Sequence, residues 1–198
     1  RAAVRALLLQ EEFLQAASMV EAEQRRLAED DAAAPESRRF EDAILTLASA
    51  DIQIERGRPK EAMRLCEKSL ADFQELEDKR WLAAAYENIS SIAFAQGKVD
   101  KSLEAAEKAL DLFREVGDNK QEAGILRSMS RSHAAKGDVG EALKRAQESQ
   151  ALCSELGDRR GEAAALECLA NAYLAKPDGA AGALDMAMKS VRLCREIG

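Results

Sequence analysis

The stretch Leu110-Asp-Leu-Phe-Arg-Glu-Val-Gly-Asp-Asn-Lys120 decides the fold, because two close variants of it occur at a fixed distance along the chain. LADFQELEDKR begins at Leu70 and QALCSELGDRR begins at Gln150, so consecutive copies start 40 residues apart. A second set of landmarks has the same spacing: Gly57, Gly97 and Gly137, with Pro177 in the next position. A fixed period of this length is typical of a solenoid of stacked repeats.

Each repeat predicts two helices joined by a short turn. In the unit from Asn119 to Asp158, the first helix is expected over about 120–135, with an inner face of Ala123, Leu126, Met129, Ser130 and His133. Gly137 should end it, since glycine adopts the left-handed conformation of a helix stop. The second helix should reach about residue 156, with an inner face of Ala142, Leu143, Ala146, Ser149 and Leu152.

Aspartates are expected at the helix starts. Asp118, with Gln121 three residues later, and Asp138, with Glu141 three residues later, both have the spacing of a capping box. Gly157 should stop the second helix of this unit, and Asp158 should begin the next unit.

The sequence therefore predicts an all-α protein, a right-handed α-solenoid of antiparallel helix pairs. We expect residues 1–36 to form a degenerate N-terminal helical unit and a linker. Residues 37–198 should form the solenoid, with units at about 37–78, 79–118, 119–158 and 159–198. A one-residue insertion is expected near Asp178 and Gly179, since Ala142 corresponds to Ala183. Because the sequence begins with Arg1 and ends where another unit would begin, we expect a fragment, or a partner that covers the last helix.

Composition excludes several classes of function. The chain has 29 Lys and Arg against 36 Asp and Glu, a formal net charge of −7, so it lacks the basic excess that phosphate contacts need and we expect no nucleic-acid binding. One histidine and four cysteines without a C-x-x-C pair predict no metal site. Membrane insertion is not expected, because no stretch has the roughly 20 apolar residues of a spanning helix.

Catalysis is not expected either. The sequence contains no glycine-rich phosphate loop, no H-E-x-x-H and no nucleophile elbow, so we predict no catalytic site and no cofactor. His133, the one histidine, falls at a packing position, whereas a general base needs partners within reach. Cys153 and Cys194 are equivalent residues one unit apart, which at roughly 10 Å per helix is too far for a disulfide.

The segment Leu166-Glu-Cys-Leu-Ala-Asn-Ala-Tyr173, followed after a turn by Ala183-Leu184, resembles the tetratricopeptide repeat pattern. Ala170 and Ala183 match its small positions and Tyr173 its aromatic position. The 40-residue period with a Gly-Asp junction resembles the long repeats of kinesin light chains and spindle-orientation adaptors. The resemblance covers at least residues 43–198 and implies protein or peptide binding in a groove.

In that family the first helix of each unit lines the concave surface. The resemblance therefore implies a partner-binding groove made of Glu87, Asn88, Ser91, Phe94, Arg127, Arg131, Asn171 and Leu174. The repeat equivalents of Arg127 are Glu87 and Glu167, which predicts a structural ion-pair ladder. The equivalents of Arg131 are uncharged, which leaves it to bind an acidic group. Lysine and asparagine at matching positions would clamp a C-terminal carboxylate in this family, and the chain departs from that pattern.

We expect a non-catalytic scaffold or adaptor that binds a peptide or helix with acidic and apolar residues. Two alternatives stay open: a structural accessory subunit of a larger assembly, and a regulatory repeat domain of a larger protein. We expect an intracellular, cytoplasmic location, and an organelle stays open because the sequence does not begin with Met.

Overall fold

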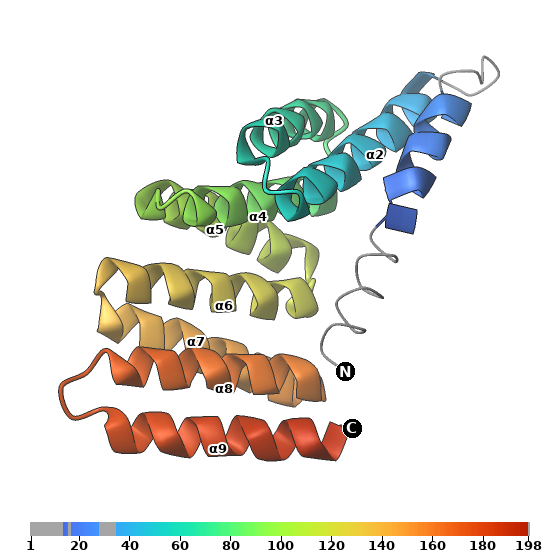
Figure 1. The fold of residues 1–198 in the computed structure, drawn as a ribbon. Helices are drawn as coiled ribbons and strands as arrows, with labels where there is room; N and C mark the ends of the chain where they lie inside the picture. The colour runs from blue at the N-terminus through green and yellow to red at the C-terminus, as the bar shows by residue number, and fades with distance from the viewer. Residues whose placement is uncertain (1–13, 16, 28–34, 198) are drawn as a thin grey trace. The chain divides into compact units, whose positions relative to one another are not determined.

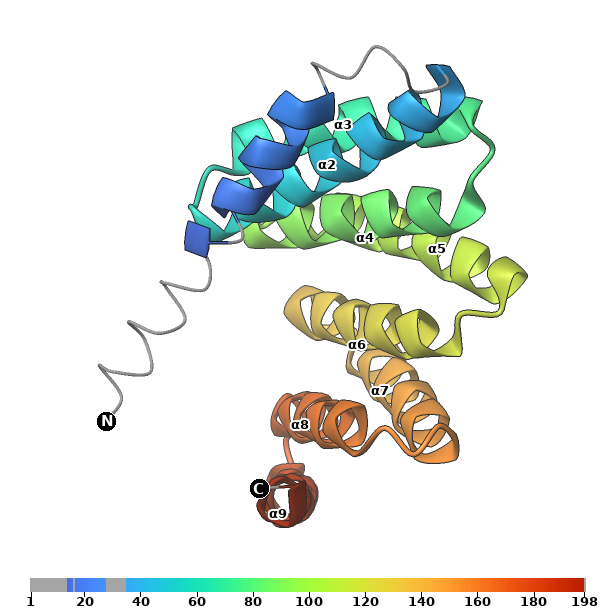
Figure 2. The same cartoon turned by 90° about the vertical axis from the view of Figure 1, so that its right-hand side faces the viewer.

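The computed structural model describes residues 14–15, 17–27 and 35–197, and these residues form helices joined by short turns (Figures 1 and 2). Residues 17–27 are helical. The following helices are α2 (Pro35–Glu55), α3 (Pro59–Glu75), α4 (Lys79–Ala95), α5 (Val99–Val116), α6 (Asn119–Lys136), α7 (Val139–Glu155), α8 (Arg159–Leu174) and α9 (Ala180–Ile197). No strand occurs in the described part of the chain. The predicted all-α class is confirmed.

The chain divides into two compact units, Arg1–Asn88 and Ile89–Gly198. The boundary lies inside α4, so the first unit contains the beginning of this helix and the second unit contains its end. The repeat units predicted from the 40-residue period are a different division, and they stay a prediction.

Glycines end the helices as the sequence predicts. Gly137 follows α6 with a φ of +85°, and its N–H donates to the carbonyl of Ala134 at 3.1 Å. Gly117 follows α5 with a φ of +68°. These are left-handed conformations, which cost glycine little because it has no Cβ.

Two of the predicted aspartate caps are confirmed and one is wrong. The Asp118 carboxylate accepts a hydrogen bond from the Gln121 N–H at 3.2 Å, and Asp158 accepts one from the Gly161 N–H at 2.9 Å. Asp138 stands at the cap position of α7, but its side chain makes no capping hydrogen bond. Its Oδ2 lies 3.5 Å from Nδ1 of His133 instead. The two atoms make no hydrogen bond, so the carboxylate lies beside the imidazole at the end of α6 rather than at the start of α7.

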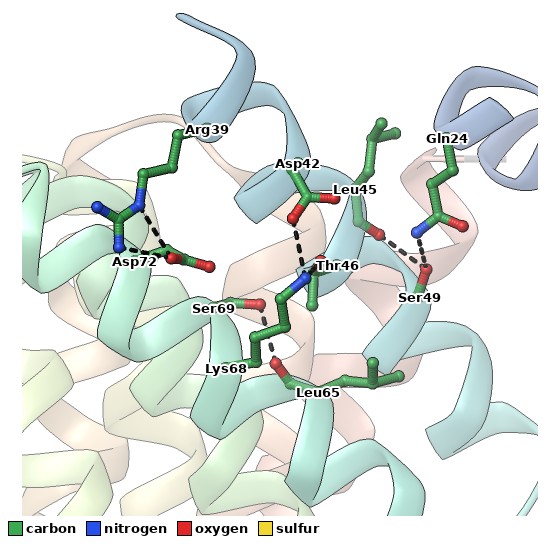
Figure 3. A network of polar contacts seen from close by, with 10 residues as sticks. All are labelled: Gln24, Arg39, Asp42, Leu45, Thr46, Ser49, Leu65, Lys68, Ser69 and Asp72. Carbon is green, nitrogen blue, oxygen red and sulfur yellow. Dashed lines mark hydrogen bonds and ion pairs between the residues drawn. The ribbon is translucent and has the colours of Figure 1, made fainter. Parts of the chain in front are cut away.

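In the first unit, polar side chains join α2 to its neighbours (Figure 3). Arg39 of α2 pairs with Asp72 of α3 at 3.0 Å, and Lys68 of α3 pairs with Asp42 at 2.9 Å. Exposed pairs of this kind contribute little to stability. The buried Phe73 ring contributes more, since it packs between two aromatic rings, edge-on to Phe40 and stacked on Trp81.

In the second unit, small residues bring the helices close together. Ala142 and Ala146 of α7 are fully buried, and Leu166, Leu169 and Ala172 of α8 belong to the same core cluster. The predicted inner face of α6 is buried at Ala123, Leu126, Met129 and Ser130, and half-buried at His133. Close contact of this kind suits a chain with only 4% aromatic residues.

Buried serines form hydrogen bonds between the helices of the second unit. Ser130 Oγ donates to the carbonyl of Ala142 at 2.7 Å, which joins α6 to α7. The hydroxyls of Ser90, Ser102 and Ser132 form a chain of two 3.1 Å hydrogen bonds through α4, α5 and α6. Each of these buried hydroxyls therefore has the partner that burial requires.

The last turn is longer than the earlier ones. Residues 175–179 separate α8 from α9, whereas residues 137 and 138 alone separate α6 from α7. Gly179 is buried in this turn, and a Cβ at its position would lie 1.7 Å from the carbonyl oxygen of Tyr173. The longer turn agrees with the insertion expected near Asp178 and Gly179.

Candidate functional site

The first helices of the repeats carry the predicted binding residues. In the second unit these helices are the end of α4, α6 and α8, and their outward side is called the first-helix face below. Helices α6 and α8 lie side by side (Figure 1). Six predicted residues belong to this unit: Ser91 and Phe94 on α4, Arg127 and Arg131 on α6, and Asn171 and Leu174 on α8.

Arg131 and Phe94 contact each other across two helices. The guanidinium carbon of Arg131 lies 5.5 Å from the centre of the Phe94 ring, the distance of a cation–π interaction. Arg131 is exposed and Phe94 is half-buried. The ring therefore supports a guanidinium group whose hydrogen-bond donors stay available at the surface.

Arg127, one turn earlier on α6, has a different environment. Its side chain is half-buried, and Nη1 donates to the carbonyl of Ala123 at 3.4 Å and points to Cys153 Sγ at 3.9 Å. Within the described part of the chain it makes no ion pair with Glu167, so the second half of the expected Glu-Arg-Glu ladder does not form. The backbone carbonyl and the thiol on α7 take the place of that carboxylate.

Cys168 of α8, which the sequence did not indicate, packs against the core cluster of α7 and α8 and lies within electrostatic range of both arginines. Its side chain is half-buried and its thiol is free. Burial raises the pKa of this thiol, while the positive charges of Arg131 and Arg127 act to lower the pKa. Both arginines thus act electrostatically on one residue of α8. The possible sequence signal was its repeat position, which Asn88 and Ser128 occupy in the preceding units.

Asn171 and Leu174 are both exposed on α8. Leu174 is 65% exposed, so most of this large apolar side chain is in contact with solvent. Beside it, the ammonium nitrogen of Lys176 lies 5.7 Å from the centre of the Tyr173 ring. The end of α8 therefore combines an uncovered apolar group with polar and basic neighbours.

Glu87 and Asn88, the two remaining predicted residues, belong to the first unit. Both side chains are half-buried. The Asn88 amide donates to the Asp51 carboxylate at 2.6 Å, which links α4 to α2. Asn88 therefore has a structural partner within its own unit.

The described residues contain no group of three or more histidine, cysteine, aspartate or glutamate side chains placed to hold a metal ion. All four cysteines lie in the described ranges and are free. Among the helices that the structure describes, none is both long and apolar enough to cross a membrane.

Comparison with known proteins gives a family match over part of the chain. Residues 41–115 match the tetratricopeptide repeat family. No curated protein matches the sequence.

Several solved structures are similar to this chain in fold. BtubC (BKLC) from P. vanneervenii is 16% identical and has a TM-score of 0.78, with 95% of this chain and 75% of that chain covered. The kinesin light chain-related, nearly identical TPR-like repeats of Podosopora anserina are 16% identical with a TM-score of 0.68, and 95% and 87% are covered.

A third neighbour is a signal transduction ATPase with numerous domains and a tetratricopeptide repeat sensor, from Pyrococcus horikoshii. It is 18% identical with a TM-score of 0.73, over 90% of this chain and 28% of that chain. At these identities the likeness concerns the fold. The resemblance to tetratricopeptide repeats that the sequence predicts is confirmed to this extent: residues 41–115 match the tetratricopeptide repeat family, and the fold of the chain is similar to that of tetratricopeptide and kinesin light chain-like repeats.

Proposed function

We propose that the chain is a non-catalytic scaffold that binds a segment of another protein on the first-helix face of its second unit. Tetratricopeptide repeats generally mediate protein–protein interaction, which supports the general role. The observation that carries the specific proposal is the exposed Arg131 guanidinium, supported 5.5 Å above the Phe94 ring.

The chemistry of this face favours a segment with acidic and apolar residues. A guanidinium group held on an aromatic ring keeps its planar fork of donors in one place, which suits a carboxylate that accepts two hydrogen bonds. Leu174, exposed at 65%, offers apolar area to the same segment. Asn171 offers amide donors and an acceptor for its backbone.

Selection from a random peptide library tests the proposal. The full chain is immobilised, and bound peptides are sequenced and compared with those selected by Arg131→Ala. Peptides from the unaltered chain should be enriched in Asp or Glu beside apolar residues, and the variant should lose this enrichment. The same enrichment in both selections would contradict the proposal, since Arg131 would then not determine which peptides bind.

A structural accessory subunit is the second candidate, and the exposed apolar side of α9 favours it. Leu184, Met188 and Val191 on this helix are each at least half exposed. Large uncovered apolar patches mark interaction sites. Affinity purification followed by mass spectrometry distinguishes the candidates: one stoichiometric, salt-resistant partner indicates a structural subunit, and several weak partners indicate an adaptor.

A further inference from the structure

Helix α9 carries an apolar stripe on the side opposite its packing against α8. Ala183 and Ser190 are buried against the rest of the unit, whereas Leu184, Met188 and Val191 are exposed at 61%, 57% and 50%. Their spacing of four and three residues places them on one helix face. They line a shallow cavity of about 500 Å³ together with Ala187, Arg192 and Arg195.

Comparison with α7, the equivalent helix one repeat earlier, separates two kinds of position in this stripe. Leu184 corresponds to Leu143, which is buried in the core cluster that α7 forms with α8. Met188 corresponds to Gln147, which stays exposed even though α8 packs on α7. A helix packed as α8 is would therefore cover Leu184 and leave Met188 in solvent.

The charged residues at the end of the α9 stripe also differ from their equivalents in α7. Arg192 and Arg195 correspond to Ala151 and Ser154, which are exposed in α7. The sequence thus adds one large apolar residue and two positive charges at positions that stay open to solvent in the preceding repeat. Ordinary repeat stacking does not account for these three residues.

The carboxylates of α9 do not neutralise the two arginines. Asp185 pairs with Lys189 at 2.7 Å, and Glu196 pairs with Arg159 of α8. Within the described part of the chain, Arg192 and Arg195 have no ion pair. The apolar stripe therefore has a positive edge, which favours an acidic occupant.

We propose that the outer side of α9 binds a partner helix that carries apolar residues at helical spacing and carboxylates along one edge. Leu184, Met188 and Val191 receive the apolar face, and Arg192 and Arg195 pair with the carboxylates. This surface is separate from the first-helix face, and its occupant covers positions that α8 leaves open on α7. Shape and charge together select an amphipathic, acidic helix.

The test uses two synthetic peptides of about 20 residues, because isolated helices shorter than about 12–15 residues are only marginally stable in water. Both carry leucines at i, i+3, i+4 and i+7, and they differ only in having glutamates or lysines on the flanks. Binding to the full chain is measured by fluorescence anisotropy. The glutamate peptide should bind at least about tenfold more tightly than the lysine peptide.

Three variants locate the site. Met188→Gln restores the residue of α7 and should weaken binding of the glutamate peptide several-fold, while Met188→Lys should weaken it at least about tenfold. The double variant Arg192→Glu/Arg195→Glu should reverse the preference between the two peptides. Gln147→Lys, at the equivalent position of α7, is the matched control and should bind like the unaltered chain.

Equal binding of both peptides, or undiminished binding by Met188→Lys with an unchanged thermal midpoint, would overturn the proposal. So would a stable dimer in sedimentation equilibrium that Met188→Lys separates, because the occupant would then be a second copy of the chain. The two surfaces are tested separately in the Arg131→Ala background, which alters only the first-helix face: there the glutamate peptide should still bind more tightly than the lysine peptide, and Met188→Lys should still weaken its binding.

Discussion

The buried hydroxyl of Ser149 on α7 donates a 2.8 Å hydrogen bond to the carbonyl of Ala123 on α6. The same bond recurs one repeat later, where Ser190 of α9 donates to Ala163 of α8 at 3.1 Å. In each case the serine joins the second helix of a pair to the first. Ala146, three residues before Ser149, is fully buried as well, so the inner side of α7 consists of small residues here.

Ser149→Ala should lower the free energy of unfolding by about 1 kcal/mol, because the helix pair loses this hydrogen bond without a change in shape. Ser154→Ala, five residues later on the exposed side of α7, is the control and should have almost no effect. Urea midpoints measure both. Equal midpoints for the two variants would show that the Ser149 bond contributes nothing to stability.

Ala142→Leu should destabilise the chain by about 1–3 kcal/mol, since the added atoms have no space at a fully buried position. Ala183→Leu, at the equivalent position of α9, should behave in the same way. Ala151→Leu on the exposed side of α7 serves as the matched control. If the variants at the buried alanines unfolded at the same urea concentration as the control, the assigned contact between the helices would be wrong.

Glu77→Gly should stabilise the chain. Glu77 has a φ of +54°, a left-handed conformation, at the repeat position where Gly117 and Gly157 stand. A non-glycine residue in this region costs about 1 kcal/mol or more, so the glycine should raise the unfolding free energy by up to about 1 kcal/mol.

The reverse experiment is Gly117→Ala. A Cβ at Gly117 meets no atom within 4 Å, so the change alters backbone conformation alone, and stability should fall. Calorimetric midpoints that move in the same direction for both variants would disprove this explanation.

Alkylation should distinguish the cysteines. Burial raises the pKa of the Cys66 thiol to about 12, so almost no reactive thiolate is present at pH 8, whereas Cys194 is exposed. Iodoacetamide should therefore modify Cys194 first and Cys66 only after unfolding. Because the folded chain holds this proton longer than the unfolded chain does, the contribution of Cys66 should make stability fall as pH rises from about 9 toward 12. Rapid modification of Cys66 in the native chain, followed by peptide mass mapping, would contradict its burial.

The fold could be predicted from the sequence because its signals are periodic. Gly117 and Gly137 each end a helix, and Ala142 and Ala183 are buried at equivalent positions. The role of a residue in one unit therefore predicts the role of its equivalent in the next. Side-chain partners were less predictable, since they depend on distances between helices. Asp138 was expected to cap α7, but its carboxylate makes no capping hydrogen bond and lies beside His133. Arg127 likewise reaches the Ala123 carbonyl instead of Glu167.

The same distinction applies to the candidate site: the helix face of a residue could be predicted from the sequence, but its side-chain contacts could not. The spacing of Arg127 and Arg131 placed both on one helix face, but the sequence did not show that Phe94 would support only Arg131. The α9 stripe was missed for a different reason. Its signal is the change from Gln147 to Met188 and from Ala151 to Arg192 between equivalent positions, and a periodic pattern hides such single departures.

The affinity of Arg131→Ala tests the central claim most directly. A peptide selected by the unaltered chain is titrated into the chain, into Arg131→Ala, and into Lys144→Ala, an exposed control on α7. We expect Arg131→Ala to bind at least about tenfold more weakly, equivalent to roughly 1.4 kcal/mol, with a thermal midpoint close to that of the unaltered chain. Arg131→Lys should restore only part of the affinity, because lysine lacks the planar fork of donors. If Arg131→Ala bound as tightly as the unaltered chain while Lys144→Ala lost binding, the partner would lie on the second helices, and the account of the first-helix face would be wrong.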